Sequence, residues 1–159
     1  MKVSTKSPES VTKSIVNAYQ KGDTEAVKKC FGLDPDKKCA EEITQEIKYN
    51  MKQFEAYGAS EVNFTKCESL GNFNGYDLVY AIYNLIKKDK DDKKSEALEI
   101  PSMSMYFVKE KDKKYHVVPA KDVTDELSKI SSEEFSKFMK TDVYKTYGEG
   151  LQKVYTGKS

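Results

Sequence analysis

The hydrophobic residues of this chain follow two different periods along the sequence. Up to about residue 58 they recur every three or four positions, which predicts α-helices with one apolar face. From about residue 60 they alternate with polar residues, which predicts β-strands, and helical spacing returns after Pro119. We therefore expect an α+β protein, with three N-terminal helices packed on a curved antiparallel sheet of about four strands and a C-terminal helical addition.

Start and stop signals mark the three N-terminal helices. Residues 7–9, Ser-Pro-Glu, offer an N-cap, a proline for the first helical position and an acidic first turn. Gly22, Gly32 and Gly58 stand where the apolar faces end, as expected at helix C-termini. The third helix is the longest, and its apolar face runs through residues 40–54.

The longest apolar run, residues 76–86, predicts the central strand because aromatic and β-branched residues dominate it. Both of its faces carry apolar residues, whereas a strand with one solvated face alternates cleanly. Both faces must then be covered, and the N-terminal helices can cover only one of them. We expect helices within residues 121–155 to cover the other, with a second copy of the chain as the alternative.

The remaining elements follow from shorter patterns. Further strands are expected at about 60–69, 97–109 and 115–118, with a turn at 71–75 and charged hairpin tips at 87–96 and 110–114. After Pro119 we expect a short helix around Leu127, a second helix opened by a capping box at 131–134, and a last amphipathic helix at 143–155.

Composition narrows the choice of partners. The 27 basic and 26 acidic residues of this 159-residue chain almost cancel, so we expect one domain without a marked attraction for nucleic acid. Every basic residue is a lysine, and the absence of arginine weakens, without excluding, phosphate recognition. With one histidine, no Cys-x-x-Cys pair and no glycine-rich phosphate loop, we expect no metal, nucleotide or redox cofactor. No stretch is apolar enough to span a membrane.

The cysteines raise the question of a disulfide. Cys30 is expected on the apolar side of the second helix and Cys39 at the start of the third, and the loop between them contains Gly-Leu-Asp-Pro-Asp. This turn could bring the two within bridging distance, and an exported chain would oxidise them. The alternative is two unrelated thiols. In either case Cys67 stays free.

Tyrosine is the most abundant residue that could form a binding site, since the chain has eleven tyrosines and no tryptophan. Tyr76, Tyr80, Tyr83 and Tyr106 fall in expected strands, where an apolar ring with a polar tip suits a ligand pocket or a protein interface. Ordinary packing is the alternative. His116, the single histidine, is a further candidate, although a hydrogen-bonded strand residue is its plainer interpretation.

The segments 7–11, Ser-Pro-Glu-Ser-Val, and 18–26, Ala-Tyr-Gln-Lys-Gly-Asp-Thr-Glu-Ala, resemble the opening of cystatin-like, nuclear-transport-factor-2-like domains. In that superfamily the first helix ends in a Lys-Gly-Asp-type turn, the second begins at once, and a curved sheet wraps a longer helix. The helical tail departs from the usual pattern, which often ends on a strand. We therefore divide the chain into a flexible leader at 1–6, a cystatin-like domain at 7–119 and a helical extension at 120–159 packed on the same domain.

The resemblance also carries implications for function. Many members of the superfamily belong to bacterial lipoproteins, which implies an extracytoplasmic location and a lipid anchor upstream of this chain, with a cytoplasmic protein as the alternative. In the enzymes of the superfamily, acids, histidines and tyrosines inside a cone transfer protons, which implies Asp77 with Tyr80 or Tyr83. A solvated carboxylate beside a glycine-rich turn is the plainer interpretation of Asp77.

Because such folds host enzymes, ligand binders and interaction modules alike, the fold does not supply the function. We expect a non-catalytic binding or protein-interaction module whose partner is an unknown protein or small molecule, monomeric rather than homodimeric. The alternative is a small-molecule-binding protein or enzyme with a cone-shaped pocket lined by the tyrosines and Asp77.

Overall fold

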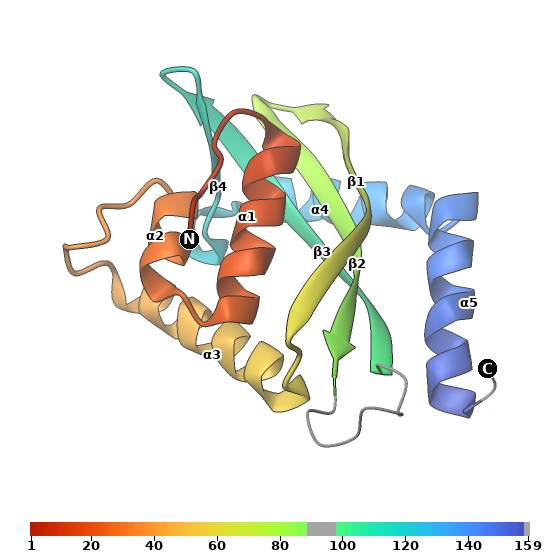
Figure 1. Ribbon diagram of the computed structural model, residues 1–159. Helices are drawn as coiled ribbons and strands as arrows, with labels where there is room; N and C mark the ends of the chain where they lie inside the picture. The colour runs from red at the N-terminus through yellow and green to blue at the C-terminus, as the bar shows by residue number, and fades with distance from the viewer. Residues whose placement is uncertain (89–97, 158–159) are drawn as a thin grey trace.

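The computed structural model describes residues 1–88 and 98–157, so most of the expected hairpin tip at 87–96 lies outside the described residues. It confirms the α+β class, with N-terminal helices, a four-stranded antiparallel sheet and C-terminal helices (Figure 1). The elements are α1 (Pro8–Lys21), α2 (Thr24–Cys30), α3 (Glu41–Tyr57), β1 (Glu61–Phe73), β2 (Tyr76–Lys87), β3 (Leu98–Lys111), β4 (Lys114–Val117), a 3-10 turn η1 (Ala120–Asp122), α4 (Asp125–Phe138) and α5 (Asp142–Thr156).

The N-terminal helices begin and end where their capping residues predict. The Ser7 hydroxyl accepts a hydrogen bond from the Ser10 amide at 3.0 Å, and the Ser10 hydroxyl accepts one from the Ser7 amide at 3.0 Å. Gly22 and Gly58 close α1 and α3 with left-handed φ angles of 67° and 72°, a conformation that glycine adopts without strain. Asp23 caps the next helix at once, so α1 and α2 form a tight pair.

The strands follow one another in the order β1-β2-β3-β4, and each pairs with the next. The expected turn at 71–75 is wrong in extent, because β1 continues to Phe73 and the turn consists of Asn74 and Gly75 alone. Gly71 lies inside the strand with φ 144°, at a register shift between Ser69 and Gly71. A bulge accommodates the extra residue and lets the strand continue past the glycine.

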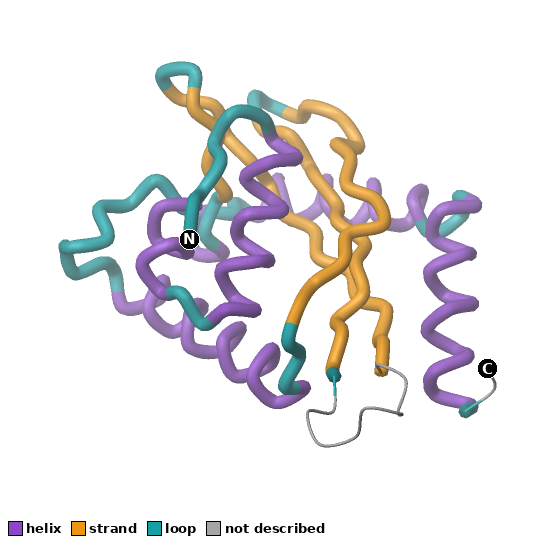
Figure 2. The backbone as a smooth tube through the Cα atoms, in the orientation of Figure 1, coloured by secondary structure: helices purple, strands orange, loops and turns teal. Residues whose placement is uncertain are grey.

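The two faces of β2 enter different layers, as the sequence predicts (Figure 2). Val79, Ala81, Tyr83 and Leu85 form what we call the first face, which packs against α1–α3 in one large core. Leu78, Tyr80 and Ile82 form the second face, which packs against α4 and α5 in two smaller clusters. The helices of the same chain therefore cover the second face.

One helix boundary in the C-terminal part was predicted wrongly. We expected a break between a helix around Leu127 and another opened by a capping box at 131–134, but α4 runs unbroken from Asp125 to Phe138. Thr124 caps it instead, with its hydroxyl accepting a hydrogen bond from the Leu127 amide at 3.2 Å. With the start fixed there and no glycine or proline before Phe138, the two serines at 131–132 are carried inside the helix.

The first six residues, for which we expected a flexible leader, lie against the folded domain. Val3 packs against the large core, and the Ser4 amide donates to the Ser14 hydroxyl at 3.0 Å. The Thr5 carbonyl accepts a hydrogen bond from the Tyr115 amide on β4 at 3.0 Å. The segment thus occupies the side of β4 that no other strand covers.

Candidate functional site

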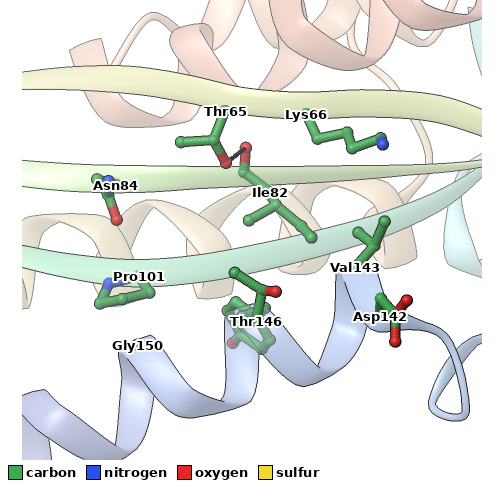
Figure 3. Close-up of a pocket in the computed structure, with 10 residues that line it drawn as sticks. Thr65, Lys66, Ile82, Asn84, Pro101, Asp142, Val143, Thr146 and Gly150 are labelled. Carbon is green, nitrogen blue, oxygen red and sulfur yellow. Dashed lines mark hydrogen bonds between the residues drawn. The ribbon is translucent and has the colours of Figure 1, made fainter.

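An open groove with a volume of about 470 Å³ lies between α5 and the second face of the sheet (Figure 3). We call it the α5 groove. It is lined by Thr65, Lys66, Ile82, Asn84, Pro101, Asp142, Val143, Thr146, Tyr147 and Gly150. All three long strands contribute, and α5 supplies the opposite wall.

The groove exists because α5 is held firmly at its start and loosely further on. Thr141 caps the helix, and Tyr144 packs edge-on to Phe138 with ring centroids 5.9 Å apart. No residue of α5 is fully buried, and Tyr155 in its last turn is 76% exposed. Further along, a Cβ atom placed on Gly150 would lie 3.5 Å from Cγ of Pro101, so the glycine allows the helix to approach β3 closely at this point.

Pro101 shapes the floor of the groove without interrupting the sheet. The Val118 amide donates to the Phe107 carbonyl, so the odd-numbered residues of β3 direct their backbone groups away from β2. Pro101 is also odd-numbered, so its backbone nitrogen points away from β2. On that side β4 pairs with β3 only as far as Val108. The missing N–H of the proline therefore faces an open edge, the position at which strands tolerate proline and which it protects from unwanted pairing.

The lining is mostly apolar, with a few polar groups. Ile82 and Val143 face each other across the groove, and the Asn84 amide points toward α5 from β2 (Figure 3). The Thr65 hydroxyl is already engaged, since it donates to the Ile82 carbonyl at 3.2 Å. Burial and the neighbouring Tyr144 raise the pKa of Tyr147, so its phenol, which is protonated at neutral pH in any case, stays protonated under more alkaline conditions as well. The groove can hold an apolar molecule and offer it a small number of hydrogen bonds.

None of the six candidate ligand residues from the sequence lines this groove. Tyr80 is on the second face but is buried, with its hydroxyl donating to Glu68 at 3.1 Å and its ring 4.5 Å from that of Phe138. Tyr83 and Tyr106 belong to the large core on the first face, where the Tyr83 and Ser104 hydroxyls lie 2.8 Å apart. These three tyrosines serve packing in the structure.

The acid–tyrosine sets implied by the resemblance are not brought together. Asp77 accepts a hydrogen bond from the Ser69 hydroxyl at 3.3 Å, and its side chain lies on the face opposite to that of Tyr80. Tyr83 shares its face but is six residues further along β2, about 20 Å at the rise of an extended strand. Neither tyrosine can exchange a proton with Asp77 directly.

Tyr76 and His116 do come together, away from the α5 groove. They line a second depression of about 350 Å³ at the edge of the sheet, which we call the hairpin hollow. Its walls come from the β3–β4 hairpin, the start of β2, the end of α2 and the segment that follows β4. Lys109 and Lys111 also line it.

The proposed Cys30–Cys39 disulfide is not formed in the structure, in which Cys30, Cys39 and Cys67 are free thiols. Cys30 is fully buried in the large core, and this burial raises its pKa to about 12. The Cys39 sulfur lies 3.4 Å from the Thr44 hydroxyl at the start of α3. Within residues 1–88 and 98–157, no three His, Cys, Asp or Glu side chains gather closely enough to bind a metal ion.

Sequence reasoning missed the α5 groove, although two signals pointed to it. Gly148 and Gly150 interrupt the amphipathic pattern of the last helix, and Pro101 marks an unusual position in a strand. Each lowers local packing, but a single sequence does not show that the helix and the strand meet.

Comparison with known proteins adds no family assignment, since no family model and no curated protein matches this chain. Across the described residues, no helix is both long and apolar enough to cross a membrane. The arrangement of helices and sheet is an α+β fold compatible with cystatin-like and nuclear-transport-factor-2-like domains.

Proposed function

We propose that this protein is a non-catalytic binding module that holds a small, largely apolar molecule in the α5 groove. The observation that carries the proposal is the groove itself, whose volume of about 470 Å³ is bounded by Ile82, Pro101, Val143 and Tyr147. Binding sites for small molecules typically have volumes of about 300–1,000 Å³ and mostly apolar walls.

The electrostatics of the groove favour a neutral ligand. Lys66 lies at the groove but pairs with Glu68 at 3.6 Å, and Asp142 supplies a negative charge from the first turn of α5. The lining itself therefore carries one charge of each sign, and no positive charge is left free to attract an anion. The Asn84 amide and the Thr146 hydroxyl can orient a ligand that carries one or two polar atoms.

A neutral fluorescent probe, N-phenyl-1-naphthylamine, tests the proposal. The wild-type protein should increase the fluorescence of the probe in a saturable manner with a stoichiometry of one. The variant Gly150→Leu should weaken this binding at least tenfold, because the new side chain fills the space beside Pro101. Loss of affinity by that factor corresponds to about 1.4 kcal/mol.

Gly148→Leu is the matched control. It makes the same change two residues earlier in the same helix, but a Cβ at Gly148 meets nothing within 4 Å and the residue does not line the groove. It should bind the probe as the wild type does. Equal binding by Gly150→Leu, or the absence of saturable binding by the wild type, would overturn the proposal.

We also propose that the chain is the soluble part of an exported, lipid-anchored bacterial protein of the cystatin-like superfamily. Support comes from the resemblance of residues 7–26 and from the compatible fold. The native gene provides the test. An apolar segment that ends in a small residue followed by cysteine, upstream of Met1, would support the proposal, and its absence would contradict it.

A further inference from the structure

The β3–β4 hairpin places four basic side chains on one of its faces. Lys109 pairs with His116 and Lys111 pairs with Lys114, and directly opposed residues of antiparallel strands project to the same side. Like charges in directly opposed positions destabilise a hairpin. Lys111 and Lys114 form such a pair, so the stability of the fold does not account for it, and a counter-charge from outside would relieve it.

These basic residues border a concave site. Lys109, Lys111 and His116 line the hairpin hollow, and Lys114 lies beside it in register with Lys111. Tyr76 continues the row on β2, with the Lys109 ammonium 5.4 Å from the centre of its ring. The row thus combines cations with an aromatic surface at the rim of a depression of about 350 Å³.

Gly32 lies directly against the imidazole of His116. A Cβ atom at Gly32 would lie 3.0–3.2 Å from three atoms of the imidazole ring, and the residue has a φ of 77°. A larger residue would press on the ring and would also be strained in this backbone conformation. The end of α2 can approach the histidine this closely only because glycine occupies the position.

The charges around His116 leave the hollow positive. Asp122, on η1, is the single acidic residue among the described residues that line it, and its carboxylate is engaged by Lys121 at 2.7 Å. Burial lowers the pKa of His116, and the nearby Lys114 lowers it further. The environment therefore disfavours another cation and would favour an anion, which would in turn stabilise the imidazolium.

We propose that the hairpin hollow binds the phosphate group of a phosphate monoester that also carries an apolar body. Lys109 and Lys111 supply charge from within the hollow, Lys114 adds to it from the margin, and His116 donates a hydrogen bond. Lysine binds phosphate as a point charge, without the bidentate geometry of arginine. A dianion matches this cluster better than a carboxylate, which would leave more of its positive charge uncompensated.

The apolar walls of the hollow are the reason why we expect the phosphate monoester to carry an apolar body. Phe31 at the end of α2 and the segment Val118-Pro119 supply apolar parts of the lining. Such a ligand can be a soluble metabolite or the headgroup of a lipid such as phosphatidic acid, since both present the same phosphate monoester. The site is separate from the α5 groove, and its test is independent of the function proposed there.

The single histidine of the chain makes the test direct, because His116 alone gives imidazole signals in an NMR spectrum. The probe is phenyl phosphate, with sodium sulfate at equal ionic strength as the screening control. Saturating phenyl phosphate should raise the pKa of His116 by about one, as a nearby opposite charge does. Methyl phosphate should bind more weakly, because it lacks the apolar body.

The double variant Lys109→Gln/Lys111→Gln should abolish the response of His116 to phenyl phosphate. Lys113→Gln is the control variant, since it removes one lysine charge from the turn of the same hairpin, at a residue that does not line the hollow. It should respond as the wild type does. An unchanged response in the double variant, or equal responses to sulfate and phenyl phosphate, would overturn the proposal.

Vesicles of phosphatidylcholine with and without phosphatidic acid separate the two sources of phosphate. Cosedimentation that depends on phosphatidic acid and is lost in the double variant identifies a lipid headgroup as the ligand. A response to phenyl phosphate without cosedimentation identifies a soluble phosphate monoester. The proposal fails if neither phenyl phosphate nor the vesicles with phosphatidic acid are bound.

Discussion

The two faces of the central sheet differ in how completely they are covered. Among the described residues, the first face belongs to a single core of seventeen buried residues shared with α1–α3, whereas the second face belongs to two clusters of three buried residues each. Seven residues of α1 are buried, and none of α5 is. The apolar side chains of β2 are thus buried on both faces, but the helix α5 that helps to cover the second face is itself only partly buried.

This difference separates stability from binding within one small domain. Dense packing on the first face fixes the curvature of the sheet and the position of each strand. With the scaffold fixed in this way, the second face can keep an incompletely filled space without loss of the fold. In ligand sites of this kind, a rigid sheet forms one wall and a less stable element forms the other. The element that moves when a ligand binds is typically among the least stable regions of the molecule.

Deletion of residues 131–159 should have the largest effect, because it removes most of the cover from the second face. This deletion should expose Tyr80 and Ile82, which Phe138 now covers. The shortened chain should self-associate or precipitate, because soluble monomers rarely tolerate a contiguous apolar patch larger than a few hundred Å². Analytical ultracentrifugation and thermal unfolding would measure this. A truncated chain that stays soluble, monomeric and equally stable would show that the tail is not the cover.

A pair of point substitutions should show the next largest difference. Ile15 on α1 is fully buried in the large core, and replacing it with alanine should cost about 2–5 kcal/mol in the free energy of unfolding. Val143 on α5 is half-buried, and the change to alanine there should cost less than about 1 kcal/mol. Urea denaturation of both variants measures the two costs. Similar costs would mean that α5 is packed as firmly as α1.

The two faces also differ in how much of their structure could be predicted from the sequence. The boundaries of β2, the two-sided pattern of β2 and β3 and the caps at Ser7, Gly22 and Gly58 could all be predicted, because they depend on local spacing and backbone preference. The α5 groove could not, because it depends on the distance between two elements fifty residues apart in the chain. Tyr80 and Tyr83 illustrate this limit. A tyrosine side chain suits the wall of a ligand pocket, and only the packing in the structure shows that both are buried within the protein.

Thiol chemistry offers a third comparison between the faces. Under denaturing, non-reducing conditions we expect three reactive thiols, and a single one would instead reveal a Cys30–Cys39 disulfide. In the native protein, Cys30 should react only when the large core opens, since burial both shields it and disfavours its thiolate. A cysteine introduced by Val143→Cys should react at least ten times faster at the same pH. Equal rates would contradict the difference in packing.

The smallest expected effects concern the two glycines of α5. Alanine at either position should stabilise the helix by about 0.5–1 kcal/mol, because glycine loses more backbone freedom when a helix forms. At Gly148 the new methyl group meets nothing within 4 Å, so this gain should appear alone. At Gly150 the methyl group would also touch Pro101 at an ordinary contact distance of 3.5 Å and narrow the α5 groove.

If α5 opens locally, the gain should appear mainly in the helix itself. Hydrogen exchange of the α5 amides should slow about two- to fivefold in both variants, which is the factor that 0.5–1 kcal/mol produces, while the global free energy of unfolding changes less. The two variants should then differ in their affinity for the fluorescent probe, because only Gly150→Ala should weaken its binding. A slower global unfolding with no change specific to α5 would mean that this helix unfolds together with the large core. A destabilising Gly150→Ala would mean that α5 already presses on β3, leaving no space for a ligand between them.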